Sequence, residues 1–385
     1  MFKKSLVAVA VLGAAAFSAQ AADVTLYGLV DYGFAYQHID GDAAGVDATD
    51  SFKMNSGMNS GSRFGLKGTE DLGNGLTVGF VLENGFAADT GAFSTDGKLF
   101  DREAQLNLSG AFGTISMGRV GQLASANGSY GLIGKASPFS SGWGDSVGMK
   151  YVMADGLGRM DNTITYVSPN FAGVNVYAQY SFKNNTKEDG DEGKSNANRY
   201  YGLGVTYATG NLYLVGIVDM INHGDKMYFG GTGYDYTYDE DQMTVTLGGN
   251  YDFGVAKVYA MGQYFKNALA VGQKTIGDNG FGKFGYSFGD SAGWEGADGY
   301  GIAVGVGVPA FGGTAKAHVG YLDAEAAENS AVKFNRWNVA VGYDYALSKR
   351  TSVYTAAAYT KDDASDYTGL EPSSTEVMAG MIHKF

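Results

Sequence analysis

The sequence predicts an all-β fold, a transmembrane antiparallel β-barrel of sixteen strands with short turns at one end and long loops at the other. Segments in which apolar and polar residues alternate recur along the chain, which is typical of strands with one apolar and one polar face. The connections between these segments are alternately short and long, as in outer-membrane barrels. After residue 21 no apolar run reaches the ~18 residues of a transmembrane helix.

The N-terminus has the pattern of an export signal. Two lysines precede an apolar run over 6–17, and Ala19-Gln20-Ala21 fits a small-x-small cleavage site. The run is shorter than the ~20 residues that span a bilayer, although a retained anchor stays as the alternative. We expect a signal peptide over 1–21, cleaved after Ala21, and a barrel domain over 22–385.

Composition excludes several classes of function. The chain has no Cys, which removes disulfides, thiol catalysis and Cys-based metal sites. A net charge of -13 argues against nucleic acid as a partner. The four His stand at no triad or metal-ligand spacing, so we expect neither an enzyme nor a bound metal. No nucleotide cofactor is expected, because the Gly-rich fragment at 202–204 lies within a predicted strand.

Two acidic loop segments, at 188–192 and 239–241, leave one alternative open. They could bind divalent cations or be ordinary solvated surface charge. No complete calcium-loop pattern is present, which favours the second interpretation.

The stretch 62–84 shows the strand pattern most clearly. Phe64 and Leu66 fall on one face of the first run, whereas Arg63 and Lys67 fall on the other, and a Gly-rich turn at 70–75 leads into a second alternating run. In a soluble sandwich the charged face would meet bulk water. In a membrane barrel it would line a water-filled lumen.

Taken in order, the chain yields sixteen strands joined by seven short turns and eight longer connections. That asymmetry favours the barrel, and sixteen strands leave an aqueous channel. The predicted strands are 24–36, 62–69, 76–84, 101–109, 114–119, 159–168, 174–182, 199–207, 211–220, 242–251, 255–265, 298–308, 314–322, 336–345, 351–360 and 375–385.

The barrel should close between the first and last strands, because an unpaired strand edge in hydrocarbon is costly. The last strand is suited to this: five side chains share one face and the chain stops on an aromatic. They are Val377, Ala379, Met381, His383 and Phe385.

Several phrases together resemble the Gram-negative general porins: VTLYG at 24–28, SRFGLKGTEDLGNGL at 62–76, FGTISMGR at 112–119, TYVSPNFAGV at 165–174, YALSKRTSVY at 345–354 and the final HKF. The resemblance implies a homotrimer of barrels with periplasmic turns and extracellular loops, embedded in outer-membrane lipid and lipopolysaccharide. It also implies insertion by the outer-membrane assembly machinery, which reads the terminal Phe385.

The resemblance further implies that the third long loop, here 120–158, folds into the barrel and faces arginines of the wall. These positions carry over to Arg63, Arg119 and Arg159, with Asp145 on the loop. Alternation places Arg63 and Arg159 on the lumen face, with Met160 opposite Arg159. Arg119 shares parity with lipid-facing residues, so either a bulge at Gly118 resets the register or the residue lies above the membrane.

The loop departs from the family pattern. Porin loops usually carry Pro-Glu-Phe-Gly, whereas the nearest match here, at 137–140, lacks the Glu. Only Asp145 and Asp155 of the loop are acidic, against Lys135 and Lys150. We therefore expect a constriction in which the positive charge of the wall arginines exceeds the negative charge of the loop.

Other side chains are assigned by alternation alone. Lys67, Lys316 and His318 should line the lumen. Arg102 has the parity of a lipid-facing residue and could contact another subunit. Aromatic side chains near the short turns should form an interfacial girdle: Tyr27, Phe171, Phe253, Phe311 and Tyr345.

The expected function is passive diffusion of ions and small hydrophilic solutes across the outer membrane, with a preference for anions. Two alternatives stay open. A substrate-specific channel would need an aromatic track, to which Tyr130, Phe139 and Trp143 of the loop could contribute. A structural or adhesive surface barrel would conduct poorly.

Overall fold

A computed structural model describes residues 23–42, 47–154, 156, 158–184, 197–223, 227–228, 235–236, 240–272, 296–327 and 329–385. The predicted signal peptide, the acidic segment at 188–192 and Asp155 lie outside these ranges. Among the residues described, no helix is long and apolar enough to cross a membrane.

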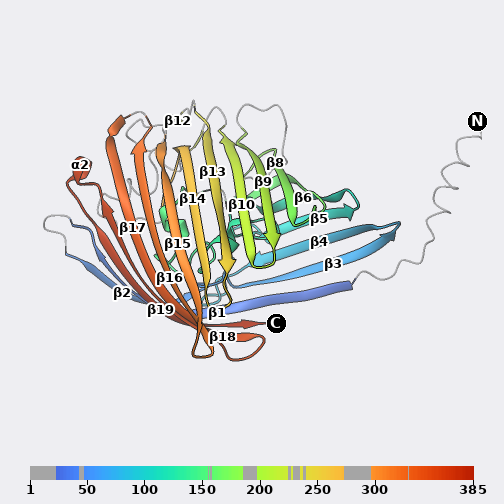
Figure 1. Cartoon of the computed structure of the whole chain (residues 1–385), viewed down its shortest axis with the longest axis horizontal. Coiled ribbons are helices and arrows are strands. Elements are labelled where there is room, and N and C mark those ends of the chain that lie inside the picture. The colour runs from blue at the N-terminus through green and yellow to red at the C-terminus, as the bar shows by residue number, and fades with distance from the viewer. Residues whose placement is uncertain are drawn as a thin grey trace, which may run out of the picture.

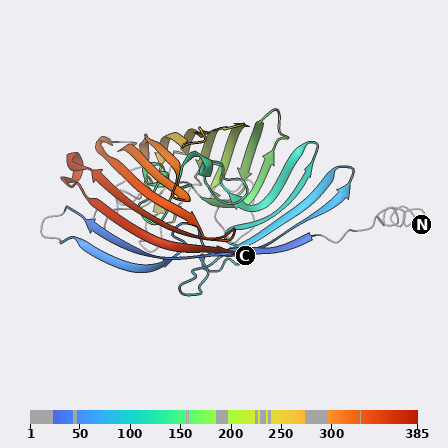
Figure 2. The same cartoon turned by 60° about the horizontal axis from the view of Figure 1, so that its bottom comes forward.

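Seventeen of the described strands form one closed antiparallel sheet, which Figures 1 and 2 show from two directions. Strands that follow one another in the chain pair with each other, except that β2 and β3 both pair with β1, and β1 pairs with β19, so the predicted barrel is confirmed. The strands are β1 Asp23–Asp40, β2 Thr49–Ser56, β3 Arg63–Gly73, β4 Leu76–Gly85, β5 Glu103–Gly110, β6 Gly113–Gly121, β7 Arg159–Val167, β8 Val174–Ser181, β9 Arg199–Thr209, β10 Leu212–Asn222, β13 Gln242–Asp252, β14 Lys257–Ala268, β15 Ala297–Ala310, β16 Gly313–Ala326, β17 Asn329–Ala346, β18 Thr351–Asp363 and β19 Ser373–Lys384.

Small elements complete the described chain. Two 3-10 turns, η1 Ile133–Ala136 and η2 Met149–Val152, lie between β6 and β7. A short hairpin of β11 Met227–Tyr228 and β12 Asp235–Tyr236 follows β10, and one helical turn, α2 Ser365–Thr368, precedes β19.

Alternation along the strands separates an outer and an inner face. On β9, Tyr201, Leu203 and Val205 are exposed, whereas the residues that alternate with them, Tyr200, Gly202, Gly204 and Thr206, are buried. Exposed large apolar side chains on a membrane barrel contact lipid, and the buried alternates point into the barrel. The period of two therefore predicted the orientation of most side chains correctly.

Two connections differ from the predicted ones. The region before residue 57, expected to be a loop, contains β2, which pairs with β1. Because β2 and β3 pair with successive parts of β1, they share one position, and the described sheet has sixteen positions around the barrel. The connection expected over 323–335 is a tight turn, because β16 extends to Ala326 and β17 begins at Asn329. Its Ala-rich sequence hid the alternation.

The first and last strands close the barrel through their backbones. The Phe385 N–H donates to the Gly28 carbonyl oxygen at 3.0 Å, and the Gly28 N–H donates to the Phe385 oxygen at 3.2 Å. A Cβ on Gly28 would overlap the Phe385 ring, so glycine leaves the space in which the ring lies. The predicted outer face of the last strand is exposed, including Val377, Met381 and Phe385.

Four of the five girdle aromatics are exposed near short turns: Phe171, Phe253, Phe311 and Tyr345. Tyr27 was assigned wrongly. Its hydroxyl donates to the Glu83 carboxylate at 3.0 Å, inside the barrel. Sequence position near a turn does not distinguish an inward from an outward aromatic.

Candidate functional site

The third loop, residues 122–158 between β6 and β7, folds into the barrel. One apolar cluster joins its buried side chains, among them Leu123, Ile133, Met149 and Val152, to the inner faces of β10 and β14 to β17. At ~25 cal/mol per Å² of apolar surface, burial of several such side chains holds a loop firmly. The loop is therefore a fixed part of the lumen, on the wall opposite β2 to β5 (Figure 2).

A second apolar cluster fixes the middle of the loop to β17 to β19. The Phe139 and Trp143 rings meet edge to face with centroids 5.0 Å apart, and Trp143 meets Tyr354 of β18 in the same way at 5.4 Å. Small wall residues make room for them: a Cβ on Gly342 would lie within 2.6 Å of the Phe139 ring. These aromatics face the wall.

Polar contacts fix the same loop in register. The Tyr213 hydroxyl donates to the Leu132 carbonyl oxygen at 2.9 Å, and the Asn338 amide donates to the Ser146 carbonyl oxygen at 2.6 Å. The Asp145 N–H donates to the Glu376 carboxylate, with its oxygens at 2.9 and 3.1 Å. Directional bonds of this kind specify which way the loop lies, whereas apolar burial alone does not.

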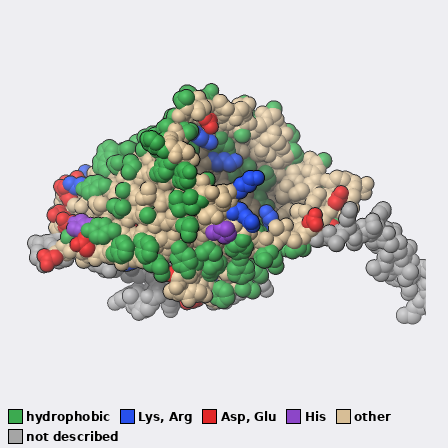
Figure 3. Space-filling view, turned by 90° about the horizontal axis from the view of Figure 1, so that it is seen from below, with side chains coloured by type: hydrophobic (Ala, Val, Ile, Leu, Met, Phe, Trp, Pro, Cys, Tyr) green, Lys and Arg blue, Asp and Glu red, His purple; other side chains and the backbone are tan. Residues whose placement is uncertain are grey.

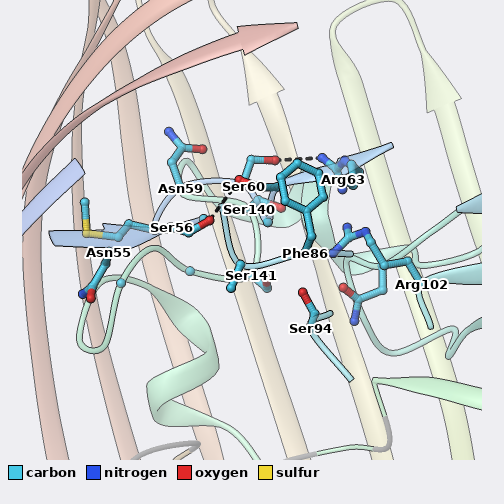
Figure 4. Close-up of a pocket in the computed structure, with 18 of the residues that line it drawn as sticks. Asn55, Ser56, Asn59, Ser60, Arg63, Phe86, Ser94, Arg102, Ser140 and Ser141 are labelled. Carbon is cyan, nitrogen blue, oxygen red and sulfur yellow. Dashed lines mark hydrogen bonds between the residues drawn. The ribbon is translucent and has the colours of Figure 1, made fainter. Parts of the chain in front are cut away.

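Opposite the third loop, basic side chains of the wall border a cavity of about 910 Å³ (Figure 4). Asp89 and Asp145 are the acidic side chains among its described lining residues. The basic ones are Lys53, Arg63, Arg102, Lys150 and Arg159. Figure 3 shows the molecule from below, with Lys and Arg side chains gathered in a hollow of that face.

Ion pairing neutralises part of this charge. Arg102 Nε lies 2.7 Å from a Glu83 carboxylate oxygen, and Arg63 Nη1 lies 4.0 Å from the same oxygen. Arg63 Nη2 donates to the Ser60 hydroxyl at 2.8 Å. Arg159 Nε is buried without a hydrogen-bond partner among the described residues. One carboxylate thus serves two guanidinium groups, and positive charge remains in excess.

Arg119 reaches the lumen through a bulge. The β6–β7 register shifts between Gly118 and Val120, where β7 contains the extra residue, and Gly118 itself has φ of +132°. Arg119 Nη1 lies 2.6 Å from a carboxylate oxygen of Asp161, which also pairs with Lys98 at 2.6 Å. Arg119 lines a second cavity of about 500 Å³ together with Lys150 and Arg159. The unusual backbone at Gly118 and the extra residue of β7 opposite it interrupt the alternation at Arg119.

Replacing Gly118 with alanine should therefore move Arg119. A Cβ at this position would overlap the Ala104 carbonyl oxygen, and the backbone conformation is one that L-residues avoid at a cost of about 1–3 kcal/mol. We expect a lower thermal midpoint and a smaller anion preference in Gly118→Ala. The matched control is Gly262→Ala on β14, where an added Cβ has no neighbour closer than 3.8 Å. Equal behaviour of the two variants would contradict the bulge argument.

Two orientations predicted from parity were wrong. Arg102 points into the lumen, where it contacts Glu83, and is not placed for contact with another subunit. Met160 is fully buried beside Tyr200 and Ile221, on the inner face. The cause in β7 is Asn162, whose φ of +51° interrupts the alternation. A single left-handed residue of this kind leaves little signal in the sequence.

The remaining predicted lining residues divide into two groups. Lys67 lies over the inward Tyr27 ring at 5.1 Å, and Lys316 lies over Trp143 at 4.7 Å and pairs with Asp344 at 2.6 Å. Both are on the lumen face. His318 has the predicted orientation but is only 2% exposed, because η2 covers it.

The proposed aromatic track is not formed. Tyr130, Phe139 and Trp143 are all buried, at 7%, 0% and 3% exposure, and the two apolar clusters contain them. Phe139 and Trp143 border a cavity of about 340 Å³, but their rings pack against wall residues and have almost no exposed surface to offer a passing solute. The sequence predicted correctly that these aromatics belong to the inward loop, but they face the barrel wall and not the path of a solute.

A profile of the Gram-negative porin family matches residues 8–365. An outer membrane porin protein of Bordetella pertussis is 32% identical over 426 residues, and outer membrane porin protein 32 of Delftia acidovorans is 32% identical over 403 residues; both alignments cover 100% of each chain. Among solved structures, an anion-selective porin from Comamonas acidovorans has a TM-score of 0.68 at 27% identity, over 95% of this chain and 100% of that one.

These matches extend over the strands, the third loop and the arginine-bearing wall together. A water-filled barrel of this kind needs no reacting group, and the relatives are channels and not enzymes. The chain therefore belongs to the Gram-negative porin family and is a diffusion channel of the outer membrane.

Proposed function

We propose that this porin prefers anions and that Arg63, Arg102, Arg119 and Arg159 set the preference, with the third loop as the opposite side of the constriction. The observation that carries the proposal is the lining of the larger cavity, five basic side chains against two acidic ones in the described chain. Asp145 is one of those acids and acts as the minor counter-charge. The anion selectivity stated for the Comamonas acidovorans relative agrees with this proposal.

The net charge of the protein does not oppose the proposal. The chain carries -13 overall, but Asp89 and Asp145 are the acids among the described residues that line the larger cavity. A permeating ion responds mainly to charges within a Debye length, about 8 Å at physiological salt. The arginines border the cavity itself, whereas the distant acids are screened. Lys67 and Lys316 add positive charge along the same lumen.

The wild-type channel tests the proposal directly. In a planar bilayer with a tenfold KCl gradient, we expect the reversal potential to have the sign of a Cl⁻/K⁺ permeability ratio above one. The preference should weaken as salt is raised, because the field of the arginines is screened. A cation-selective sign at low salt would overturn the proposal.

We propose further that the channel is a homotrimer, embedded in lipid and lipopolysaccharide, and that Phe385 serves the outer-membrane assembly machinery as its signal. Support for a subunit contact comes from the outer face near β1, where the exposed Phe34 and Phe52 rings stack at 5.7 Å. The bilayer recordings above also address this, since a trimer closes in three equal steps.

A further inference from the structure

The strand position shared by β2 and β3 is interrupted by an inset segment, residues 57–62. Tyr32 of β1 pairs with Ser56 before the interruption, and Leu29 pairs with Arg63 after it. Two residues of β1 therefore face six residues of the interrupted strand. A bulge usually contains one extra residue, so this surplus must leave the sheet altogether.

The inset segment leaves toward the lumen. Met58 is buried in the cluster that contains Phe139 and Trp143 of the third loop. The Gly144 N–H donates to the Met58 carbonyl oxygen at 2.7 Å. The segment thus meets the third loop inside the barrel, although the two are far apart in sequence.

Asp31 of β1 holds the inset segment in place. One carboxylate oxygen accepts the Asn59 and Ser60 N–H groups at 2.9 and 2.7 Å, and the other accepts the Tyr354 hydroxyl at 2.7 Å. The Asp31 side chain has no exposed surface. A buried carboxylate with three donors is a strong and directional anchor.

The inset segment and the third loop together divide the lumen. Asn59, Ser60 and Ser140 border the cavity of about 910 Å³, which extends toward the loop end of the barrel. The same three residues border a third cavity, of about 340 Å³, which reaches Ala346 and Ser352 at the turn end. Figure 4 labels Ser60 of the inset segment and Ser140 of the third loop among the residues that line the larger cavity. The two cavities therefore share this part of their lining, where residues of the inset segment and of the third loop both contribute.

We propose that the inset segment is a second lip of the constriction and that Asp31 is the residue that positions it. Asp31 fixes the backbone of Ser60, and the Ser60 hydroxyl in turn orients the Arg63 guanidinium. The part that concerns Arg63 rests on the proposed anion preference. The part that concerns the aperture does not.

The test compares Asp31→Ala with Asp31→Asn in single-channel recordings. Both changes remove the same negative charge near Arg63, but the asparagine oxygen can still accept the two N–H groups. Asp31→Ala should raise the conductance about 1.5-fold, because conductance follows the free cross-section of the narrowest part. It should also lower the Cl⁻/K⁺ ratio. Asp31→Asn should keep the wild-type conductance and leave the ratio equal or higher.

The expected changes in conductance and in the Cl⁻/K⁺ ratio distinguish a positioning role of Asp31 from an electrostatic one. Loss of the negative charge by itself would raise the anion preference in both variants. If Asp31→Ala and Asp31→Asn have the same conductance and the same ratio, Asp31 positions nothing and the inference is overturned. If the wild type proves cation-selective, the proposed function fails, yet the conductance difference between the two variants still decides the role of the lip.

A second variant covers a failure of Asp31→Ala to fold. Ser60→Ala removes the hydroxyl that orients Arg63 and leaves Asp31 and its hydrogen bonds in place. We expect a lower Cl⁻/K⁺ ratio with little change in conductance. An unchanged ratio in Ser60→Ala would overturn the route from Asp31 to Arg63.

Discussion

Replacing Arg63, Arg102 and Arg159 together by glutamine is expected to reverse the ion preference of the channel. A unit charge about 6 Å from a permeating ion contributes about 0.7 kcal/mol at the permittivity of water, roughly a threefold change in local ion concentration. Three such charges, allowing for screening, should lower the Cl⁻/K⁺ permeability ratio by about tenfold. The Glu83 carboxylate would lose both guanidinium partners and add its own field.

The control removes as many positive charges elsewhere. Lys333, Lys349 and Arg350 are exposed and do not line the cavities of about 910, 500 and 340 Å³, so their replacement by glutamine should leave the reversal potential nearly unchanged. Gel migration before and after heating would verify that both triple variants are folded. If the two triple variants shift the reversal potential equally, total charge and not the constriction determines selectivity.

The sequence could predict the barrel because its determinants are local. Alternation, turn residues and the lengths of connections each depend on residues close together in the chain. The orientation of Leu203 or Arg63 follows from counting along one strand. The same counting failed at Arg102 and Met160, because the count assumes a regular strand, and one residue such as Asn162 with positive φ resets it.

The constriction was predictable only in part, because it depends on contacts between distant segments. The inset segment leaves the sheet because Asp31 and Tyr354 lie in position to hold it, and no pattern within 57–62 indicates those partners. The direction of the loop aromatics is decided by space on the wall, where Gly342 and Ala340 admit the Phe139 ring. Such complementarity depends on residues from two distant parts of the chain, so it becomes apparent only when the positions of both parts in the fold are known.

Replacing Arg336 by methionine is expected to have the largest effect on stability. The Arg336 guanidinium donates to both Asp362 carboxylate oxygens, at 2.6 and 2.7 Å, and the pair is fully buried. Removing one partner of a buried pair typically costs about 3–5 kcal/mol, because an uncompensated charge remains. We expect a markedly lower thermal unfolding midpoint. A midpoint equal to that of the wild type would contradict this account of the pair.

Arg336 also tethers the third loop, and a double variant separates the two roles. Its Nη1 donates to the Tyr151 carbonyl oxygen at 3.2 Å and to the Gly272 carbonyl oxygen at 2.5 Å. Arg336→Met combined with Asp362→Leu removes both charges, so much of the lost stability should return. The tether to η2 stays broken, so open-channel noise should remain above the wild-type level in both variants. If the double variant restores quiet conduction as well as stability, the ion pair acts on the barrel wall alone and the apolar clusters suffice to hold the loop.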